Sequence, residues 1–228
     1  MSFVLSNESA PVIRAEPNPE EAAKEQRIQS GIPRWADAGI ALVGLVAISP
    51  IIALSALAII ITSGWPVFFC QKRVGRGGQT FTLVKFRTMA SSTDGPEITR
   101  KGDRRITRLG KFLRQTKLDE LPTLWNIVRG DMALVGPRPE VPRYVKLDDP
   151  KWLTILKVRP GITDPVTVQL RNEEDLLSGI DGDLESYYVN ELQPAKLRGY
   201  LAYLQNRSAR SDLRLLWQTL VEVLRNRR

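Results

Sequence analysis

The sequence has no histidine and only one cysteine, Cys70, among its 228 residues. Without histidine, the chain cannot by itself build a Ser-His-Asp triad, a Cys-His pair or an imidazole-ligated zinc site. A single cysteine excludes an intramolecular disulfide and any metal site made of several thiolates. Acid–base or nucleophilic chemistry must therefore come from carboxylates, lysine, tyrosine, serine or threonine.

Negative charge is also in short supply. Lysine and arginine number 33 against 25 aspartates and glutamates, which gives a formal net charge of +8. A positive excess suits an anionic partner, and nucleic acid, anionic lipid headgroups and phosphorylated small molecules all qualify. The hydrophobic share is 43%, so a chain of this length can form one domain with a real core and further segments besides.

A long segment without charge, residues 38–70, is the strongest local signal. About 20 apolar residues cross a bilayer, so this segment predicts a membrane helix. Ser49 and Pro50 lie near its middle, and they favour a bend because proline lacks a backbone donor and serine can bond back to an earlier carbonyl. Arg34 before the segment and Lys72 after it favour cytoplasmic placement of both ends. The residues leave two interpretations open, a kinked spanning helix or a re-entrant helix that leaves on the face where it entered.

We divide the chain into three parts on this basis. Residues 1–32 are rich in proline, glutamate and small side chains, which predicts a mobile leader. Residues 33–66 form the membrane segment, and residues 67–228 form the remaining domain. Any catalytic site must therefore lie mainly in the third part.

The third part begins with the pattern of a β-hairpin. Residues 67–73 and 80–87 are strand-like runs on either side of a glycine-rich turn at residues 75–78. From residue 106 to residue 129 the apolar spacing is helical, with a break at Pro122. The first half of that region is basic and amphipathic, which is typical of an interfacial helix or of a helix packed on the core with a solvated basic side.

The remaining pattern predicts a short strand at residues 166–170 and two terminal helices at residues 184–206 and 212–224. We therefore expect a mostly helical α/β fold with a small β-hairpin or sheet. If the membrane helix is re-entrant, the protein would be monotopic and would rest on one membrane face through interfacial amphipathic helices.

Asp119 and Glu120 are the leading candidates for chemistry. Adjacent carboxylates are common and are usually both solvated, but these lie beside Pro122 and among several basic residues. Nearby positive charge should depress the carboxylate pKa values and keep Asp119 ionised as a nucleophile. Its neighbour can then help to hold Mg²⁺, because phosphoryl transfer needs positive charge on the phosphoryl oxygens.

Several further motifs accompany this pair in a fixed order. They are Lys85-Phe86-Arg87-Thr88-Met89, Arg108-Leu109-Gly110-Lys111-Phe112-Leu113-Arg114, Leu118-Asp119-Glu120-Leu121-Pro122, Asn126, Gly130-Asp131-Met132, Val135-Gly136-Pro137-Arg138-Pro139 and Val158-Arg159-Pro160-Gly161-Ile162-Thr163. Together they resemble the bacterial sugar transferase family, the monotopic phosphoglycosyl transferases. The resemblance extends from about Arg34 to near the C-terminus. The re-entrant helix of that family breaks at a pair similar to Ser49-Pro50, which favours the re-entrant interpretation.

The resemblance implies a reaction. Family members transfer a phosphosugar from a UDP-sugar to undecaprenyl phosphate or a related polyprenyl carrier and release UMP. Asp119 would attack the phosphorus linked to the sugar, and Glu120 would ligate Mg²⁺. Arg114 and Arg138 are candidates for binding substrate phosphate. Lys85, Arg87 and Arg159 are weaker candidates, with a surface or packing role as the alternative for each of the five.

The resemblance also implies a location and partners. The protein would lie on the inner membrane of a bacterium, with its catalytic domain at the anionic cytoplasmic leaflet. It would perform the first membrane step of an exopolysaccharide, lipopolysaccharide or other glycoconjugate pathway. The chain departs from the common family pattern at residues 164–172, where contacts to nucleotide and sugar are expected. It looks like a short family member with a leader of its own.

Other functions compete with this one. A membrane-tethered nucleic-acid-binding protein would explain the charge, but no nucleic-acid motif is present. A catalytically inactive scaffold of a polysaccharide assembly system is a second alternative, and the intact Asp119-Glu120 pair argues against it. Within the enzyme class, direct attack by the lipid phosphate competes with a covalent intermediate. The sequence does not identify the sugar, the carrier length, the pathway, the oligomeric state or the role of the leader.

Overall fold

The computed structural model describes residues 31–90, 99, 102–164, 166, 177, 180 and 183–225. Nearly all of the predicted leader, residues 1–32, lies outside this part of the chain. The described elements are α2 (Arg34–Ser63), β1 (Phe68–Val74), the 3₁₀ turn η1 (Arg76–Gly78), β2 (Thr80–Phe86), α3 (Arg108–Gln115), the 3₁₀ turn η2 (Leu118–Thr123), α4 (Leu124–Arg129), β3 (Ala133–Val135), the 3₁₀ turn η3 (Pro142–Tyr144), α5 (Pro150–Ile155), β4 (Gly161–Thr163), α8 (Leu184–Tyr187), the π-helical turn η4 (Tyr188–Leu192), α9 (Gln193–Gln205) and α10 (Ala209–Arg225).

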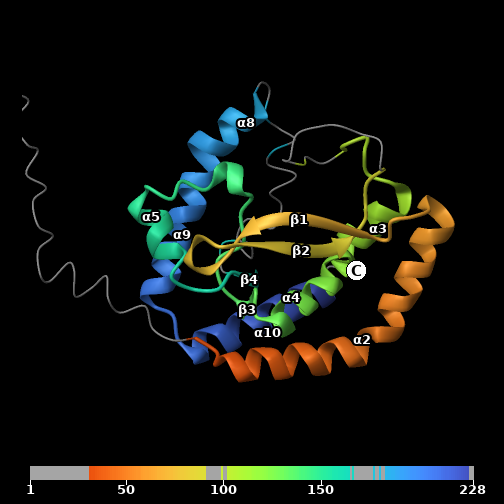
Figure 1. Ribbon diagram of the computed structural model, residues 1–228, viewed down its shortest axis with the longest axis horizontal. Helices are drawn as coiled ribbons and strands as arrows, with labels where there is room; N and C mark the ends of the chain where they lie inside the picture. Colours follow the sequence, from red (N-terminus) through yellow and green to blue (C-terminus); the bar gives the residue numbers. More distant parts are fainter. Residues whose placement is uncertain are drawn as a thin grey trace, which may run out of the picture.

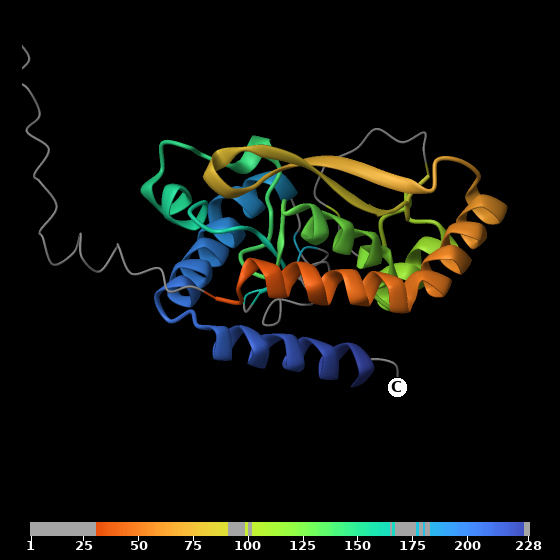
Figure 2. The ribbon, with the colours of Figure 1, turned by 60° about the horizontal axis from the view of Figure 1, so that its bottom comes forward.

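Helices dominate, and the described strands form two small sheets. Figure 1 shows the β1–β2 hairpin crossing the molecule, with α5 and α9 at one of its ends and α3 near the other. In Figure 2 the hairpin lies on one side of the molecule and α10 on the opposite side, with α2 and α4 between them. The predicted mostly helical α/β fold with a small sheet is therefore confirmed.

The predicted hairpin is present in the predicted place. Its strands pair antiparallel, from Phe68 opposite Phe86 to Val74 opposite Thr80. Gly77 and Gly78 in the turn have φ angles of 69° and 77°, a region that glycine adopts without steric cost. The hairpin brings β2, which carries Lys85, against η2.

The helix α2 bends along its length without ending (Figure 1). Pro50 has no backbone N–H, so the carbonyl of Val46, four residues earlier, loses its helical donor. The Ser49 hydroxyl donates to that carbonyl at 2.8 Å. The predicted break at Ser49-Pro50 is therefore a bend inside one continuous helix, and the serine replaces the hydrogen bond that the proline removes.

The surface of α2 is mostly apolar and exposed. By length and composition the helix could cross a membrane, and only 11% of its most apolar 18-residue window is buried within the protein. Val43, Val46, Leu54 and Ile61 are among its exposed side chains. An apolar surface of this size is more stable against lipid than against water, because removing apolar groups from water is favourable.

The amino-terminal end of α2 is fixed to the rest of the domain by polar contacts. The Arg34 guanidinium donates to the carbonyl of Val128 in α4 at 2.7 Å. Asp37 is buried, and its carboxylate accepts from the backbone N–H of Leu134 in β3 at 3.2 Å. Buried charged groups cost several kcal/mol if left unpaired, so these contacts hold the start of α2 in place.

The carboxyl-terminal end of α2 is fixed to the same domain. Arg87, just after β2, donates to the carbonyls of Ser63 and Trp65 at 2.6 and 3.0 Å, and to that of Gly64. A cation is favourable at a helix C-terminus because it satisfies carbonyls that lack helical partners. Ile59 of α2 packs in an apolar cluster with buried residues of β2 and α3. Both ends of α2 are thus bound to one domain.

The main core lies between α4, β3, α5 and α9, and includes Ile127, Met132, Trp152 and Leu204. The strands β3 and β4 pair in parallel. A Cβ atom at Gly161 would lie 2.1 Å from the backbone nitrogen of Gly136. The backbone at Gly161 therefore approaches the backbone at Gly136 at a distance that only glycine permits.

Two local predictions need correction. Val166 is helical, so the strand predicted at residues 166–170 is wrong at its first position, and residues 167–170 lie outside the described part. The helical region at residues 106–129 is interrupted at Thr116 and Lys117, before Pro122. In α3 the apolar residue Leu113 is buried while Phe112 is exposed.

Candidate active site

Asp119 and Glu120 lie in the first turn of η2, and Lys117, the residue just before η2, sets the backbone geometry there. The helix α3 ends at Gln115, and the Thr116 hydroxyl donates back to the carbonyl of Phe112 at 2.8 Å. Lys117 then has φ 58°, the only positive φ of a non-glycine residue in the part of the chain that the structure describes. This left-handed residue reverses the chain and starts η2, with Asp119 and Glu120 in its first turn.

The helix that follows is tied to strand β2 by side chains. The Thr123 hydroxyl donates to the carbonyl of Val84 at 3.0 Å. The fully buried Asn126 amide accepts from the N–H of Val84 at 3.1 Å and donates to the carbonyl of Thr82 at 2.7 Å. These bonds fix η2 and α4 against β2, so Glu120 lies opposite Lys85 of that strand.

Glu120 is bound by two cations. Lys85 Nζ and an Arg138 guanidinium nitrogen each donate to Glu120 Oε1 at 2.8 Å. Burial alone would raise the pKa of Glu120, but the charges of Lys85, Arg138 and Lys117 outweigh it and hold that pKa well below its usual range. Burial in turn lowers the pKa of Lys85, and the charge of Glu120 partly offsets this. Glu120 is therefore an anion.

Asp119 has the opposite environment. Its Oδ1 atom is buried and accepts no hydrogen bond. Burial, followed by the charge of Glu120, raises the pKa of Asp119 to about 6, although Lys85, Lys117 and Arg114 act in the other direction. The prediction that basic neighbours would depress this pKa is therefore wrong, because desolvation and the adjacent anion outweigh them. At pH 7 the carboxyl is still mostly ionised.

A pocket opens beside this pair. Its charged lining comes from Arg73, Lys85, Glu120 and Arg138, and Leu83 and Met132 are among its apolar lining residues. The structure thus brings together four residues predicted from the sequence, namely Asp119, Glu120, Lys85 and Arg138. It adds Arg73 to the lining of the pocket and places the charge of Lys117 near both carboxylates.

Arg114 lies near Asp119. Its Nε atom donates to the Thr88 hydroxyl at 2.9 Å. The close approach of α3 to the backbone of Thr88 depends on Gly110, where a Cβ atom would lie 2.0 Å from the Thr88 carbonyl oxygen. Arg114 is close enough to lower the pKa of Asp119.

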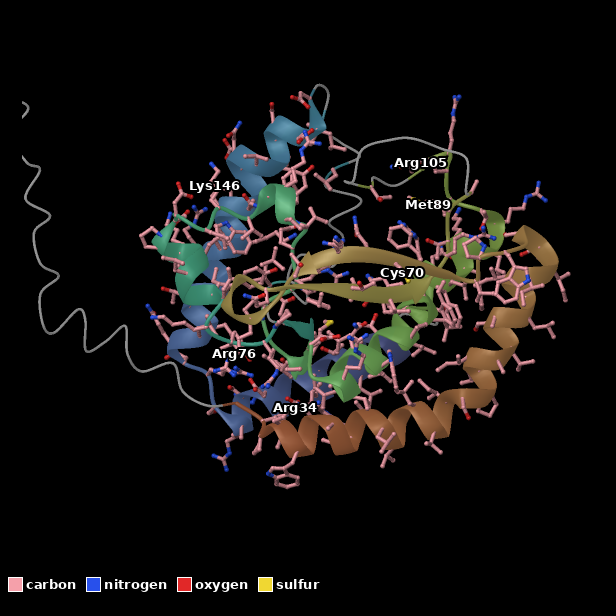
Figure 3. All side chains as sticks on the ribbon, viewed as in Figure 1. Arg34, Cys70, Arg76, Met89, Arg105 and Lys146 are labelled. Carbon is pink, nitrogen blue, oxygen red and sulfur yellow. The ribbon has the colours of Figure 1, made fainter. Side chains whose placement is uncertain are left out.

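The structure does not bring Arg87 and Arg159 into the pocket. Arg87 donates to the carbonyls at the end of α2. The Nε atom of Arg159 donates to the carbonyl of Gly130 at 2.9 Å. Burial, then the charges of Arg34 and Arg76, lower the pKa of Arg159, and Figure 3 shows both of these arginines at the end of the molecule where α2 begins. Most of the variant loop at residues 164–172 lies outside the described residues.

The sequence profile described as bacterial sugar transferase matches residues 28–226. The chain belongs to this family. Among other sugar transferases, it is 36% identical over 181 residues to the UDP-glucose:undecaprenyl-phosphate glucose-1-phosphate transferase of Caulobacter vibrioides, covering 77% of this chain and 63% of the relative. It is 32% identical to the exopolysaccharide production protein ExoY of Sinorhizobium fredii, with 92% of each sequence covered.

A third relative is named for a different sugar from that of the Caulobacter relative. The UDP-N-acetylgalactosamine-undecaprenyl-phosphate N-acetylgalactosaminephosphotransferase of Aeromonas hydrophila is 32% identical, and the match covers 86% of this chain and 44% of the relative. The chain therefore spans less than two thirds of the length of the Caulobacter and Aeromonas relatives.

Proposed function

We propose that this sugar transferase moves a sugar-1-phosphate from a UDP-sugar to undecaprenyl phosphate and releases UMP. The observation that carries the proposal is a pocket in which two cations hold Glu120, next to Asp119, whose buried Oδ1 has no hydrogen-bond partner. Relatives named for transfer of glucose-1-phosphate or N-acetylgalactosamine phosphate to undecaprenyl phosphate support the reaction class. Their names differ in the sugar, so we assign no sugar to this chain.

The chemistry follows from the unequal carboxylates. An oxygen of the Asp119 carboxylate attacks the phosphorus that carries the sugar, and the bond from that phosphorus to the UMP oxygen breaks. The product is a phosphosugar bound to Asp119 as an acyl phosphate. An oxygen of the lipid phosphate then attacks the same phosphorus and displaces the Asp119 carboxylate. Direct attack by the lipid phosphate is the competing mechanism, and trapping of a phosphosugar on Asp119 would separate the two.

The pocket cations suit this transfer. Arg138 and Lys85 lie on the pocket wall, where they can neutralise phosphoryl oxygens as charge develops. Arg114 is held by its contact with Thr88 and lies near enough to act on the charge of Asp119. An arginine binds phosphate through paired N–H groups, so Arg114 and Arg138 are the proposed phosphate ligands and Lys85 supplies a point charge.

The residues also fit a magnesium ion. Mg²⁺ is commonly held by one or two carboxylates together with substrate phosphates and water. Glu120 is anionic and Asp119 offers an unpaired oxygen, whereas no three acidic, cysteine or histidine residues cluster within the described residues. Glu120 would hold the ion, with Asp119 beside it. When bound, Mg²⁺ would neutralise charge on the phosphoryl oxygens.

We further propose that α2 is re-entrant and that the catalytic domain lies at the cytoplasmic face of the bacterial inner membrane. A straight 30-residue helix is about 45 Å long, enough to place its ends on opposite faces. Here the Ser49-Pro50 bend and the contacts of both ends with one domain support entry and exit on one face. Exposed apolar side chains on α10, Leu213 and Trp217 among them, would lie in the same interface.

The activity test is nucleotide release from a panel of UDP-sugars. Detergent-solubilised protein, undecaprenyl phosphate and Mg²⁺ would be incubated with each sugar, beside an Asp119→Asn variant. Release of UMP with at least one sugar, lost in the variant, is the expected result. Release of UDP would overturn the proposal, because it would mean that the sugar moves without its phosphate.

The topology test uses thiol labelling. Cys70 is exposed on the hairpin (Figure 3) and is the single native thiol. A second protein would carry Cys70→Ser and Trp35→Cys, which places the thiol at the exposed start of α2. A membrane-impermeant reagent should label both proteins in inverted vesicles and neither in intact spheroplasts. Labelling of the Trp35→Cys protein in spheroplasts would mean that α2 spans the membrane.

A further inference from the structure

Arg73 on β1 contacts the segment that carries Arg138. One guanidinium nitrogen of Arg73 donates to the carbonyl of Pro139 at 3.1 Å and lies 3.5 Å from Glu140 Oε1. These are the two residues that follow Arg138, which donates to Glu120. Arg73 is thus placed to control the path of the chain immediately beyond a residue of the candidate active site.

The backbone contact in the same place is equally direct. The N–H of Val74 donates to the carbonyl of Glu140 at 2.8 Å, and the second guanidinium nitrogen of Arg73 donates to the Gln71 side chain at 2.6 Å. Because Arg138 stands between Pro137 and Pro139, its backbone has little freedom of its own. Fixing the chain at Pro139 and Glu140 therefore fixes where the Arg138 side chain starts.

The far end of this contact chain lies in the carboxyl-terminal helices. The Tyr188 hydroxyl donates a short hydrogen bond to Glu140 Oε2, so the two oxygens of this carboxylate face Tyr188 and Arg73 respectively. Lys196 of α9 is buried, with Nζ 3.5 Å from the Tyr188 hydroxyl and 5.2 Å from the centre of its ring. Tyr188 opens the π-helical turn η4, a geometry that often marks functional positions.

The burial of these groups argues that the contacts have a defined geometry. The side chains of Arg73 and Glu140 are only 22% and 13% exposed, and Tyr188 is buried. Ion pairs with this burial are less screened than those at the surface, and their geometry is more restricted. The neighbouring pair of Arg143 and Glu185, at 2.6 Å, has side chains 63% and 38% exposed, so it offers a solvated counterpart between nearby elements.

We propose that Tyr188, Glu140 and Arg73 act as a positioning relay that sets the place of Arg138 against Glu120. None of the three needs to touch the reacting phosphorus. The relay rests on the proposed function for its effect on turnover, because Arg138 is assigned there to a substrate phosphate. It would make the phosphate geometry of the pocket depend on the packing of η4 and α9.

The test compares Tyr188→Phe, Arg73→Lys and Arg138→Lys, singly and in pairs, with Arg143→Gln as the matched control. Tyr188→Phe removes one hydroxyl and keeps the ring, so the fold should remain. Losing one hydrogen bond to a carboxylate should lower kcat/KM about threefold to tenfold. Arg73→Lys loses the planar contact and should lower it about tenfold to a hundredfold. Arg143→Gln should change kcat/KM less than twofold.

The double variants identify the relay. If Arg73 and Tyr188 act through Arg138, each double variant with Arg138→Lys should be no worse than Arg138→Lys alone, within about twofold. If Arg138 binds the donor, these variants should change KM for the UDP-sugar more than kcat. Their thermal midpoints should stay within a few degrees of the wild type. The relay would be overturned if the kcat/KM losses of the single variants multiplied in the double variants. It would also be overturned if the losses in kcat/KM were explained by lower thermal midpoints.

A second readout does not depend on turnover. Hydrogen exchange of the backbone amides of Arg138, Glu140 and Val141 should accelerate several-fold in Tyr188→Phe and remain unchanged in Arg143→Gln. Unchanged exchange in Tyr188→Phe would overturn the relay even in an active enzyme. If the wild type releases no UMP while Tyr188→Phe shows the faster exchange, the proposed function is refuted and the relay stands.

Discussion

Asp119 and Glu120 are neighbours in the chain, yet their surroundings shift their pKa values in opposite directions. Lys85 and Arg138 both donate to Glu120, whereas Asp119 has a buried oxygen that accepts nothing. The anion of Glu120 then adds to the burial that raises the Asp119 pKa. One carboxylate is thereby suited to hold a cation and the other to react.

The raised pKa of Asp119 predicts an acid limb in the pH profile. With that pKa near 6, kcat/KM should be flat above pH 7 and should fall about tenfold per pH unit well below pH 6, because the proposed attack needs the ionised carboxylate. UMP release measured between pH 4.5 and 8.5 checks this. A limb near pH 4 would mean that Asp119 is solvated in the working enzyme.

The same shift predicts an effect on stability. Below about pH 4 Asp119 is protonated in both the folded and the unfolded chain. Between pH 4 and 6 the unfolded chain ionises first, so stability falls as the pH rises, and above about pH 6 the full penalty is present. Asp119→Asn should therefore stabilise the inactive protein at pH 8 by about 1–3 kcal/mol, and by close to nothing at pH 4.

Thermal unfolding in detergent at the two pH values measures this difference. For a chain of this size the thermal midpoint at pH 8 should rise by about 2–8 °C. An equal change at both pH values would show that the amide acts through packing and not through loss of charge.

Residue identity was more predictable than residue environment. Asp119 and Glu120 could be named from the sequence as an adjacent carboxylate pair, and Lys85 and Arg138 because they lie in motifs that resemble those of the family. The pKa of Asp119 could not, because desolvation depends on how η2 packs against β2. Nor could the contact of Arg73 with Pro139, since 66 residues separate them and neither residue type signals the other.

At the scale of elements, α2 depends on one side chain at its bend. The Ser49 hydroxyl supplies the hydrogen bond that Pro50 removes from the Val46 carbonyl. In apolar surroundings an unsatisfied carbonyl costs about 1–3 kcal/mol. Ser49→Ala should therefore lower the thermal midpoint of the protein by several degrees, as measured in detergent or vesicles.

Thr62→Val is the matched control for this variant. The Thr62 hydroxyl also donates to a helix carbonyl, that of Ala58, at 2.8 Å. In that turn the backbone N–H of Thr62 remains available to the same carbonyl, so little should be lost. Equal losses in the two variants would contradict a special role for the Ser49 hydroxyl.

Element boundaries were less predictable than element types. The hairpin and the terminal helices follow from periodicity and glycine placement. The interruption before η2 does not, because it depends on the left-handed backbone of Lys117, and lysine carries no signal for that conformation. Proline is tolerated within the 3₁₀ turn that follows, so Pro122 was a misleading marker of the break.

At the scale of the whole molecule, a buried ionic group joins segments from both ends of the chain. Asp212 in α10 accepts from the backbone N–H of Ile32, from the Tyr203 hydroxyl and from Arg207 at 3.2, 2.6 and 3.2 Å. Arg207 also donates to the carbonyl of Val135 in β3 at 3.0 Å. One buried charge pair, Asp212 with Arg207, therefore joins the residues just before α2, the connection between α9 and α10, and strand β3.

Asp212→Asn should consequently be severe. It leaves the buried Arg207 without its counter-ion, which costs about 3–5 kcal/mol. Asp183→Asn is the control, because Asp183 caps α8 at an exposed position where asparagine caps equally well. Thermal unfolding of the two variants should differ by several degrees, and similar midpoints would show that the Arg207 charge reaches solvent.

The attachment of both ends of α2 to one domain has a consequence for the choice of lipid. A helix that crosses from face to face must match the bilayer thickness, and it tilts or stretches when the acyl chains change. A helix that turns back within one leaflet faces no such match. This transferase should then turn over at nearly the same rate in bilayers of short and long acyl chains, so an organism that remodels its membrane with temperature would keep the enzyme working.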